Sequence, residues 1–185
     1  MKARFYTLAM TLCIAGFIVV GSSWVRAAGD DKKAAAPAKD EKAVAAAHDA
    51  MDSLKALSGT SWTKTGPDGK PSEIGFKVTA NGSVVVETMF PGTKYEMVNT
   101  YHMDNDRLLV THYCAEGVQP RMQLVSNDNG VLKFEFLDGT NLKEGEGHMG
   151  GLEISVNGEQ LTEKWSYIKD GKVVGETPFE FTKKS

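Results

Sequence analysis

Residues 95–124 read YEMVNTYHMDNDRLLVTHYCAEGVQPRMQL, and this stretch decides the fold class. Two segments of alternating apolar and polar residues flank a DND turn, which predicts a β-hairpin. Successive side chains of a strand face opposite sides, so pairing Met103 with Leu108 places His112 and Cys114 on one face. Burying polar, reactive side chains without partners is costly. This face is therefore a candidate binding site.

Turn signals recur at short intervals beyond residue 57. They are PDG at 67–69, ANG at 80–82, PG at 91–92, NDNG at 127–130, DG at 138–139, NG at 157–158 and DG at 170–171. Many short alternating segments between such turns are typical of an antiparallel sandwich or barrel. We therefore expect an all-β fold over residues 58–185, an up-and-down barrel of about 8–10 strands.

The hairpins predict which side chains face inward. A three-residue loop at 80–82 pairs Val78 with Val84. On that register Val84 faces inward and Glu87 lies outside, opposite Glu96, although like charges in that position are unfavourable.

The last strand needs an irregularity. With a tight turn at 170–171, Phe179 and Phe181 fall on the face opposite Trp165, and a bulge near Pro178 would restore them to the inside.

Polar side chains line much of the predicted interior. A four-residue loop at 127–130 turns Arg121 and Gln123 inward, and a two-residue turn at 157–158 pairs Ile154 with Leu161. The candidate ligand-binding residues are Asn99, Tyr101, His112, Cys114, Arg121, Gln123, His148, Trp165 and Tyr167. So many inward polar groups favour a barrel wide enough to hold a ligand. The alternative is a filled barrel whose polar groups satisfy one another.

The N-terminus carries a predicted export signal. Lys2 and Arg4 precede an apolar run over 5–20, and the small residues that follow fit cleavage after Ala27. We expect residues 1–27 to be a signal peptide. The mature protein is then exported, periplasmic or extracellular, and soluble without a membrane span.

Two short segments precede the barrel. Residues 28–40 are rich in Ala, Lys and Asp and lack large apolar side chains, which predicts a disordered spacer. Residues 41–57 are predicted to form a helix, because a narrow apolar stripe recurs every three to four residues. Its members are Val44, Ala47, Met51 and Leu54.

Charge and cysteine content narrow the function classes. The net charge is -3, with no basic cluster among aromatic residues, so we do not expect a nucleic-acid partner. Once the signal peptide is removed, Cys114 is the one remaining cysteine and no internal disulfide is possible. Cys114 is either a buried inert thiol or a reactive one.

The chain resembles the calycins, the superfamily of lipocalins and fatty-acid-binding proteins. Lipocalins carry Gly-x-Trp on the first strand after a short helical segment, and this chain has LSGTSW at 57–62, with one further residue between Gly59 and Trp62. In the family, a basic residue near the end of the barrel packs on that tryptophan. The resemblance implies this role for Lys183 or Lys184. The resemblance implies one small, largely apolar molecule held inside the barrel.

The candidate residues leave several chemistries open. Arg121 would receive a ligand carboxylate in bidentate fashion. His112, Cys114 and His148 are candidate ligands for a metal ion, or one histidine could bind haem, as in the small haem-binding barrels related to nitrobindin. A Cys114–His112 nucleophile and base would need a third orienting group, which is not evident.

The sequence therefore favours an exported, non-catalytic binding protein for a small apolar or amphipathic, possibly anionic, ligand. The alternatives are a haem- or metal-binding barrel and a filled barrel that acts as a protein-interaction module.

Overall fold

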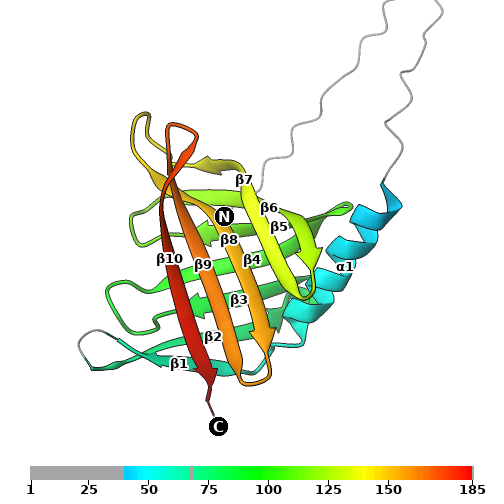
Figure 1. The fold of residues 1–185 in the computed structure, drawn as a ribbon, viewed down its shortest axis with the longest axis horizontal. Helices are drawn as coiled ribbons and strands as arrows, with labels where there is room; N and C mark the ends of the chain where they lie inside the picture. The colour runs from blue at the N-terminus through cyan, green and yellow to red at the C-terminus, as the bar shows by residue number, and fades with distance from the viewer. Residues whose placement is uncertain (1–39, 67–68, 185) are drawn as a thin grey trace, which may run out of the picture. The chain divides into compact units, whose positions relative to one another are not determined.

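The computed structural model describes residues 40–66 and 69–184 and shows a closed barrel preceded by one helix (Figure 1). The helix is α1 (Glu41–Lys55). Ten strands follow, each antiparallel to the next, and β1 pairs with β10 to close the sheet. They are β1 (Ser61–Thr65), β2 (Pro71–Thr79), β3 (Val84–Met89), β4 (Met97–Asp104), β5 (Arg107–Tyr113), β6 (Gln119–Asp128), β7 (Val131–Thr140), β8 (His148–Asn157), β9 (Gln160–Lys169) and β10 (Lys172–Lys183). The predicted all-β, up-and-down barrel with a preceding helix is confirmed.

The N-terminal predictions fall largely outside this region. The signal peptide at 1–27 and the spacer at 28–40, apart from Asp40, lie outside the described residues. Within the described ranges, no helix combines the length and the apolar character needed to cross a membrane.

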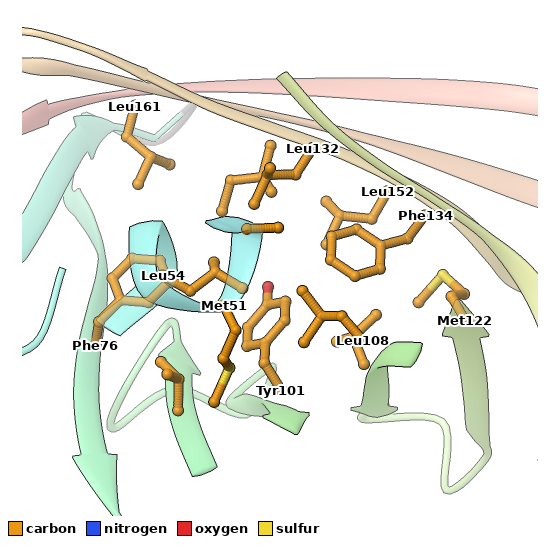
Figure 2. Packing of buried hydrophobic residues seen from close by; sticks show 14 of the residues in the cluster. Met51, Leu54, Phe76, Tyr101, Leu108, Met122, Leu132, Phe134, Leu152 and Leu161 are labelled. Carbon is orange, nitrogen blue, oxygen red and sulfur yellow. The ribbon is translucent and has the colours of Figure 1, made fainter. Parts of the chain in front are cut away.

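Helix α1 begins at a capped end and closes on the barrel core. The Asp40 side chain accepts hydrogen bonds from the backbone N–H groups of Lys42 and Ala43, which are otherwise unpaired at a helix start. Met51 and Leu54 are fully buried in the cluster that fills the barrel, as Figure 2 shows. The apolar stripe is thus the docking face, and the helix ends two residues earlier than predicted.

The two ends of the barrel differ. In Figure 1, α1 lies at the end where β4–β5, β6–β7 and β8–β9 turn tightly. Asn127 at the β6–β7 turn donates a hydrogen bond to the carbonyl of Ala46 in α1. The longer connections, residues 90–96, 114–118 and 141–147, leave the opposite end, which we call the loop end. The helix therefore covers one end of the barrel only.

The register of β3 differs from the predicted one by a single residue. Thr79 pairs with Val84, so the connection has four residues, and Ala80 and Asn81 both adopt positive φ values of 49° and 53°. Val84 therefore faces outward. Glu87 faces inward and is fully buried, which corrects its predicted position outside the barrel.

Strand β4 nevertheless presents the predicted face. The β3–β4 connection spans residues 90–96, because Met89 pairs with Met97, and the predicted two-residue turn at 91–92 is wrong. The two register errors compensate, so Asn99 and Tyr101 point inward. The Met103–Leu108 pairing of the β4–β5 hairpin is confirmed.

A bulge at Val125 reverses the predicted face of β6, and a second irregularity of this strand pair lies in β7 at Leu137. Asp128 pairs with Val131 around a two-residue turn, and the register shifts between Leu124 and Ser126 and again between Arg121 and Met122. Met122 is fully buried inside. The predicted inward positions of Arg121 and Gln123 are therefore wrong, because both alternate with the inward residues of this strand.

Strand β9 and the end of β8 at Ile154 keep the predicted faces with altered pairing. At the start of β8 a register shift between Met149 and Gly151 places Met149 opposite Tyr167, so the predicted inward position of His148 is wrong. Ile154 pairs with Glu163 and not with Leu161. Because this is a shift of two residues, Ile154 and Leu161 both remain inside. The bulge of β10 lies between Val173 and Gly175 and not near Pro178. It places Phe181 inside the barrel.

The residues of the calycin resemblance occupy the closing seam. Trp62 is buried, and Lys183 is its cross-strand partner on β10. The Lys184 ammonium lies 2.8 Å from a carboxylate oxygen of Glu73. Of the two lysines, Lys183 is thus the one beside the tryptophan.

Replacing Leu54 by Ala should lower the free energy of unfolding by about 2–5 kcal/mol, because it leaves a cavity where α1 closes on the core. Urea denaturation of the protein measures this. Asp49→Ala on the exposed face of α1 is the matched control and should stay within about 0.5 kcal/mol of the wild type. Equal stability of the two variants would show that α1 is not part of the core.

Candidate functional site

Two glutamates meet at the centre of the barrel. Glu87 of β3 and Glu163 of β9 are both 0% exposed, and their carboxyl groups hydrogen-bond to each other. Glu87 Oε2 also accepts hydrogen bonds from Asn99 Nδ2 at 2.9 Å and from the Tyr101 hydroxyl at 2.7 Å. Trp165 Nε1 donates to Glu163 Oε2 at 2.9 Å. We call these five residues the carboxyl network.

One proton shared by the two carboxyl groups makes this burial tolerable. Burial raises the pKa of Glu163 well above its usual value, and the charge of Glu87 raises it further. Burial also raises the pKa of Glu87, which donors from Glu163, Asn99 and Tyr101 oppose. The Oε1 atoms of both carboxyl groups lack a hydrogen-bond partner unless one of the two groups carries a proton. The pKa of Glu163 is raised more strongly than that of Glu87, so the shared proton belongs first to Glu163, which donates to Glu87.

Burial also keeps the Tyr101 hydroxyl protonated, so it remains a hydrogen-bond donor. Burial, followed by the negative charge of Glu87, raises the pKa of Tyr101 well above 10.0. In Figure 2 its hydroxyl points into the middle of the cluster, among apolar side chains such as Leu108 and Phe134. The phenol thus stabilises the Glu87 charge in otherwise apolar surroundings.

The network fixes the tautomer of His112. Asn99 directs its amide nitrogen at Glu87 and at the Met89 sulfur, which are acceptors, so its carbonyl oxygen faces His112 Nδ1 at 2.7 Å. Nδ1 must then carry the hydrogen, and Nε2 holds a lone pair. Burial lowers the pKa of His112 to about 4, so the ring is neutral at pH 7.

His112 Nε2 is a buried acceptor with no partner within the described ranges. The His112 side chain is 1% exposed, and its ring centre lies 4.7 Å from that of Trp165. Leaving a buried polar atom unpaired costs about 1–3 kcal/mol. Such an atom calls for a functional or solvent explanation.

The interior holds no buried Lys or Arg over residues 40–66 and 69–184. The buried polar and charged residues there are Glu87, Asn99, Thr111, His112 and Glu163. No permanent positive charge is therefore available there to pair with the carboxyl groups.

A hollow of about 590 Å³ opens at the loop end. Its walls include His148, Tyr167 and Lys169. The His148 ring lies 4.6 Å from the ring of Phe136, and its Nδ1 is 2.9 Å from the Met149 carbonyl oxygen. A Cβ on Gly147 would sit 2.3 Å from the Tyr167 ring, so only glycine permits this approach.

The predicted site residues separate into three groups. Asn99, Tyr101, His112 and Trp165 lie together inside the barrel, and His148 and Tyr167 share the loop-end hollow. The remaining three, Arg121, Gln123 and Cys114, lie elsewhere.

Arg121 is outside the barrel and already paired. Its Nε and Nη2 atoms each lie 2.5 Å from an oxygen of Asp138, and its side chain is 42% exposed. Gln123 accepts a weak hydrogen bond from Arg107 on the same outer surface. No inward guanidinium therefore awaits a ligand carboxylate at position 121.

Cys114 lies in a turn and not on the strand of His112. Strand β5 ends at Tyr113, and the Cys114 carbonyl accepts from the backbone N–H of Gly117. The side chain is half-buried, and burial raises the pKa of the thiol, which favours the less reactive protonated form. In the described part of the chain no three His, Cys, Asp or Glu side chains are grouped to hold a metal ion.

The two glutamates are the residues that the sequence reasoning missed. Glu163 stands between Leu161 and Trp165, both inward, so the period of two along β9 already indicated it. For Glu87, the signal was the unfavourable Glu87–Glu96 contact that the wrong register implied.

Comparison with known proteins gives no family. No protein-family model matches the chain, and no curated protein matches it significantly. The closed antiparallel barrel is compatible with a calycin-like fold.

The shared proton predicts a pH-dependent stability. A carboxyl whose pKa is raised in the folded state stabilises the fold below its unfolded pKa near 4.5 and loses that contribution as pH rises. His112 acts in the opposite sense, between pH 6.5 and about 4. Above pH 6.5 only the carboxyl effect of the two remains. Above pH 6.5 the wild type should therefore lose up to about 1 kcal/mol per pH unit until the pH passes the raised pKa of the folded carboxyl pair.

Glu163→Gln should flatten this slope, because glutamine still donates to Glu87 but has no proton to lose. Denaturation between pH 7 and 9 compares the two proteins. Glu180→Gln, an exposed glutamate on β10, is the control and should keep the wild-type slope. An unchanged slope in Glu163→Gln would contradict the shared proton.

Proposed function

We propose that this protein is an exported, non-catalytic binding protein that holds a small apolar or amphipathic molecule within the loop end of the barrel. The observation that carries the proposal is the unpaired, buried Nε2 of His112 inside a closed barrel. A barrel built only for stability gains nothing from a buried acceptor held in one tautomer by a chain of polar groups.

The asymmetry of the two barrel ends supports the same function. Met51 and Leu54 of α1 fill one end, and no helix covers the other end in the described part of the chain. Three of the partly buried apolar side chains, Phe90, Met97 and Met149, stand at the loop end. Methionine is unbranched and adapts its shape readily, which suits a surface that opens for a ligand.

The resemblance to calycins, whose barrels hold one small molecule, supports the proposal from the sequence side. The predicted signal peptide at 1–27 supports export. An exported carrier with one cysteine outside that peptide depends on its core for stability, and the filled helix end supplies such a core.

Native mass spectrometry of the mature protein, purified from its own cell envelope without detergent, tests the proposal. We expect an adduct that disappears on denaturation and gives the mass of the cargo. A bare mass after gentle purification would contradict a carrier and would favour the filled barrel that acts as a protein-interaction module.

A haem-binding barrel is the second candidate, and the same atom favours it. A neutral histidine with a free Nε2 is the form that binds iron. An absorption spectrum of the same sample decides between the two candidates, because bound haem gives a Soret band.

Arg121→Met should leave the affinity for the co-purifying ligand within about twofold of the wild type, because Arg121 lies outside and pairs with Asp138. Titration of the stripped protein with the recovered cargo measures this. A loss of tenfold or more would return Arg121 to the binding site.

A further inference from the structure

We infer that the interior of the binding site accepts a ligand group that donates a hydrogen bond to His112 Nε2, and that it rejects an anionic group there. This inference rests on the proposed function and specifies its ligand: a neutral hydroxyl or N–H compound with an apolar body. It replaces the carboxylate ligand that an inward Arg121 would have received.

The direction of the hydrogen bond follows from a chain of fixed donors. Glu87 is an acceptor, so Asn99 must present its amide nitrogen to it and its carbonyl oxygen to His112. His112 Nδ1 then donates, and Nε2 can only accept. The ligand atom at this position must therefore bring the hydrogen.

The described part of the interior has no cation to pair with an anion. Two carboxyl groups, Glu87 and Glu163, lie inside, and no Lys or Arg is buried within residues 40–66 or 69–184. An added carboxylate would lose its hydration beside these two acidic groups and find no positive charge to replace it, and both effects disfavour it. Lys143 and Lys169 line the loop-end hollow, and both are exposed.

The register places His112 within reach of the loop end. Asn99 and His112 are cross-strand partners, and Met97 is the next inward residue of β4 towards the loop end. The ring of Trp165 lies against His112 and offers a flat apolar wall. A planar ligand that displaces the partly buried Met97 would meet this wall and the Nε2 lone pair together.

Three matched naphthalenes test the inference on the wild-type mature chain by isothermal titration at pH 7. 2-Naphthol donates a hydrogen bond, 2-methoxynaphthalene has the same ring and oxygen without the hydrogen, and 2-naphthoate carries the negative charge. We expect 2-naphthol to bind at least tenfold more tightly than either of the others. Equal or tighter binding of 2-naphthoate, or equal binding of 2-methoxynaphthalene, would overturn the inference.

Two histidine variants test whether His112 accepts the hydrogen bond from 2-naphthol. His112→Phe keeps an aromatic ring without the acceptor and should reduce 2-naphthol binding to the level of 2-methoxynaphthalene. His48→Phe, an exposed histidine of α1, should retain the full preference for 2-naphthol. A preference that survives in a folded His112→Phe variant would assign the selectivity to another residue and overturn the inference.

A ligand-free measurement tests the same inference without any variant. A long-range ¹H–¹⁵N spectrum of the wild type at pH 7 should show His112 with hydrogen on Nδ1 and none on Nε2. The opposite tautomer would overturn the inference. Failure of all three naphthalenes to bind would also overturn it, whereas the native mass alone decides the proposed function.

Discussion

The proton shared by Glu87 and Glu163 is the interaction on which the interior of this barrel depends. The described part of the chain buries two carboxyl groups and no Lys or Arg, so two charges at this place would repel each other in surroundings that screen them poorly. One shared proton removes this repulsion and fixes which neighbouring groups donate hydrogen bonds and which accept them. Tyr101 and Asn99 donate to Glu87, and Asn99 in turn sets the tautomer of His112. Because Asn99 takes the hydrogen on Nδ1 of His112, the Nε2 atom of His112 is left as an unpaired acceptor.

The fold class could be read from the sequence because it rests on many independent local signals. Turn residues at short intervals and a period of two between them indicate a meander whatever the pairing of any one hairpin. The β4–β5 hairpin was predicted residue by residue, since its DND turn permits a tight connection. Likewise, the apolar stripe of α1 identified its docking face, as the burial of Met51 and Leu54 shows.

The site was harder to predict because the length of each connection decides which side chains of the next strand point into the barrel. One residue more between Thr79 and Val84 brings Glu87 from the surface to the barrel centre. No glycine or proline marks the bulge of β6 at Val125, so Arg121 and Gln123 were assigned to the wrong side. Asn99, Tyr101, His112 and Trp165 were found because their strands kept the predicted face.

The closing seam ties the assembly of this interior to the whole chain. Strands β1 and β10 meet in only two registered pairs, Trp62 with Lys183 and Thr63 with Thr182, and they come from opposite ends of the barrel sequence. Such distant pairing is entropically expensive and forms slowly during folding. Glu87 and Glu163 likewise come from separate halves of the chain, so a partly folded barrel gives neither carboxyl its partner. Desolvation of these groups and closure of the sheet are therefore coupled, and the chain has reason to fold as one cooperative unit.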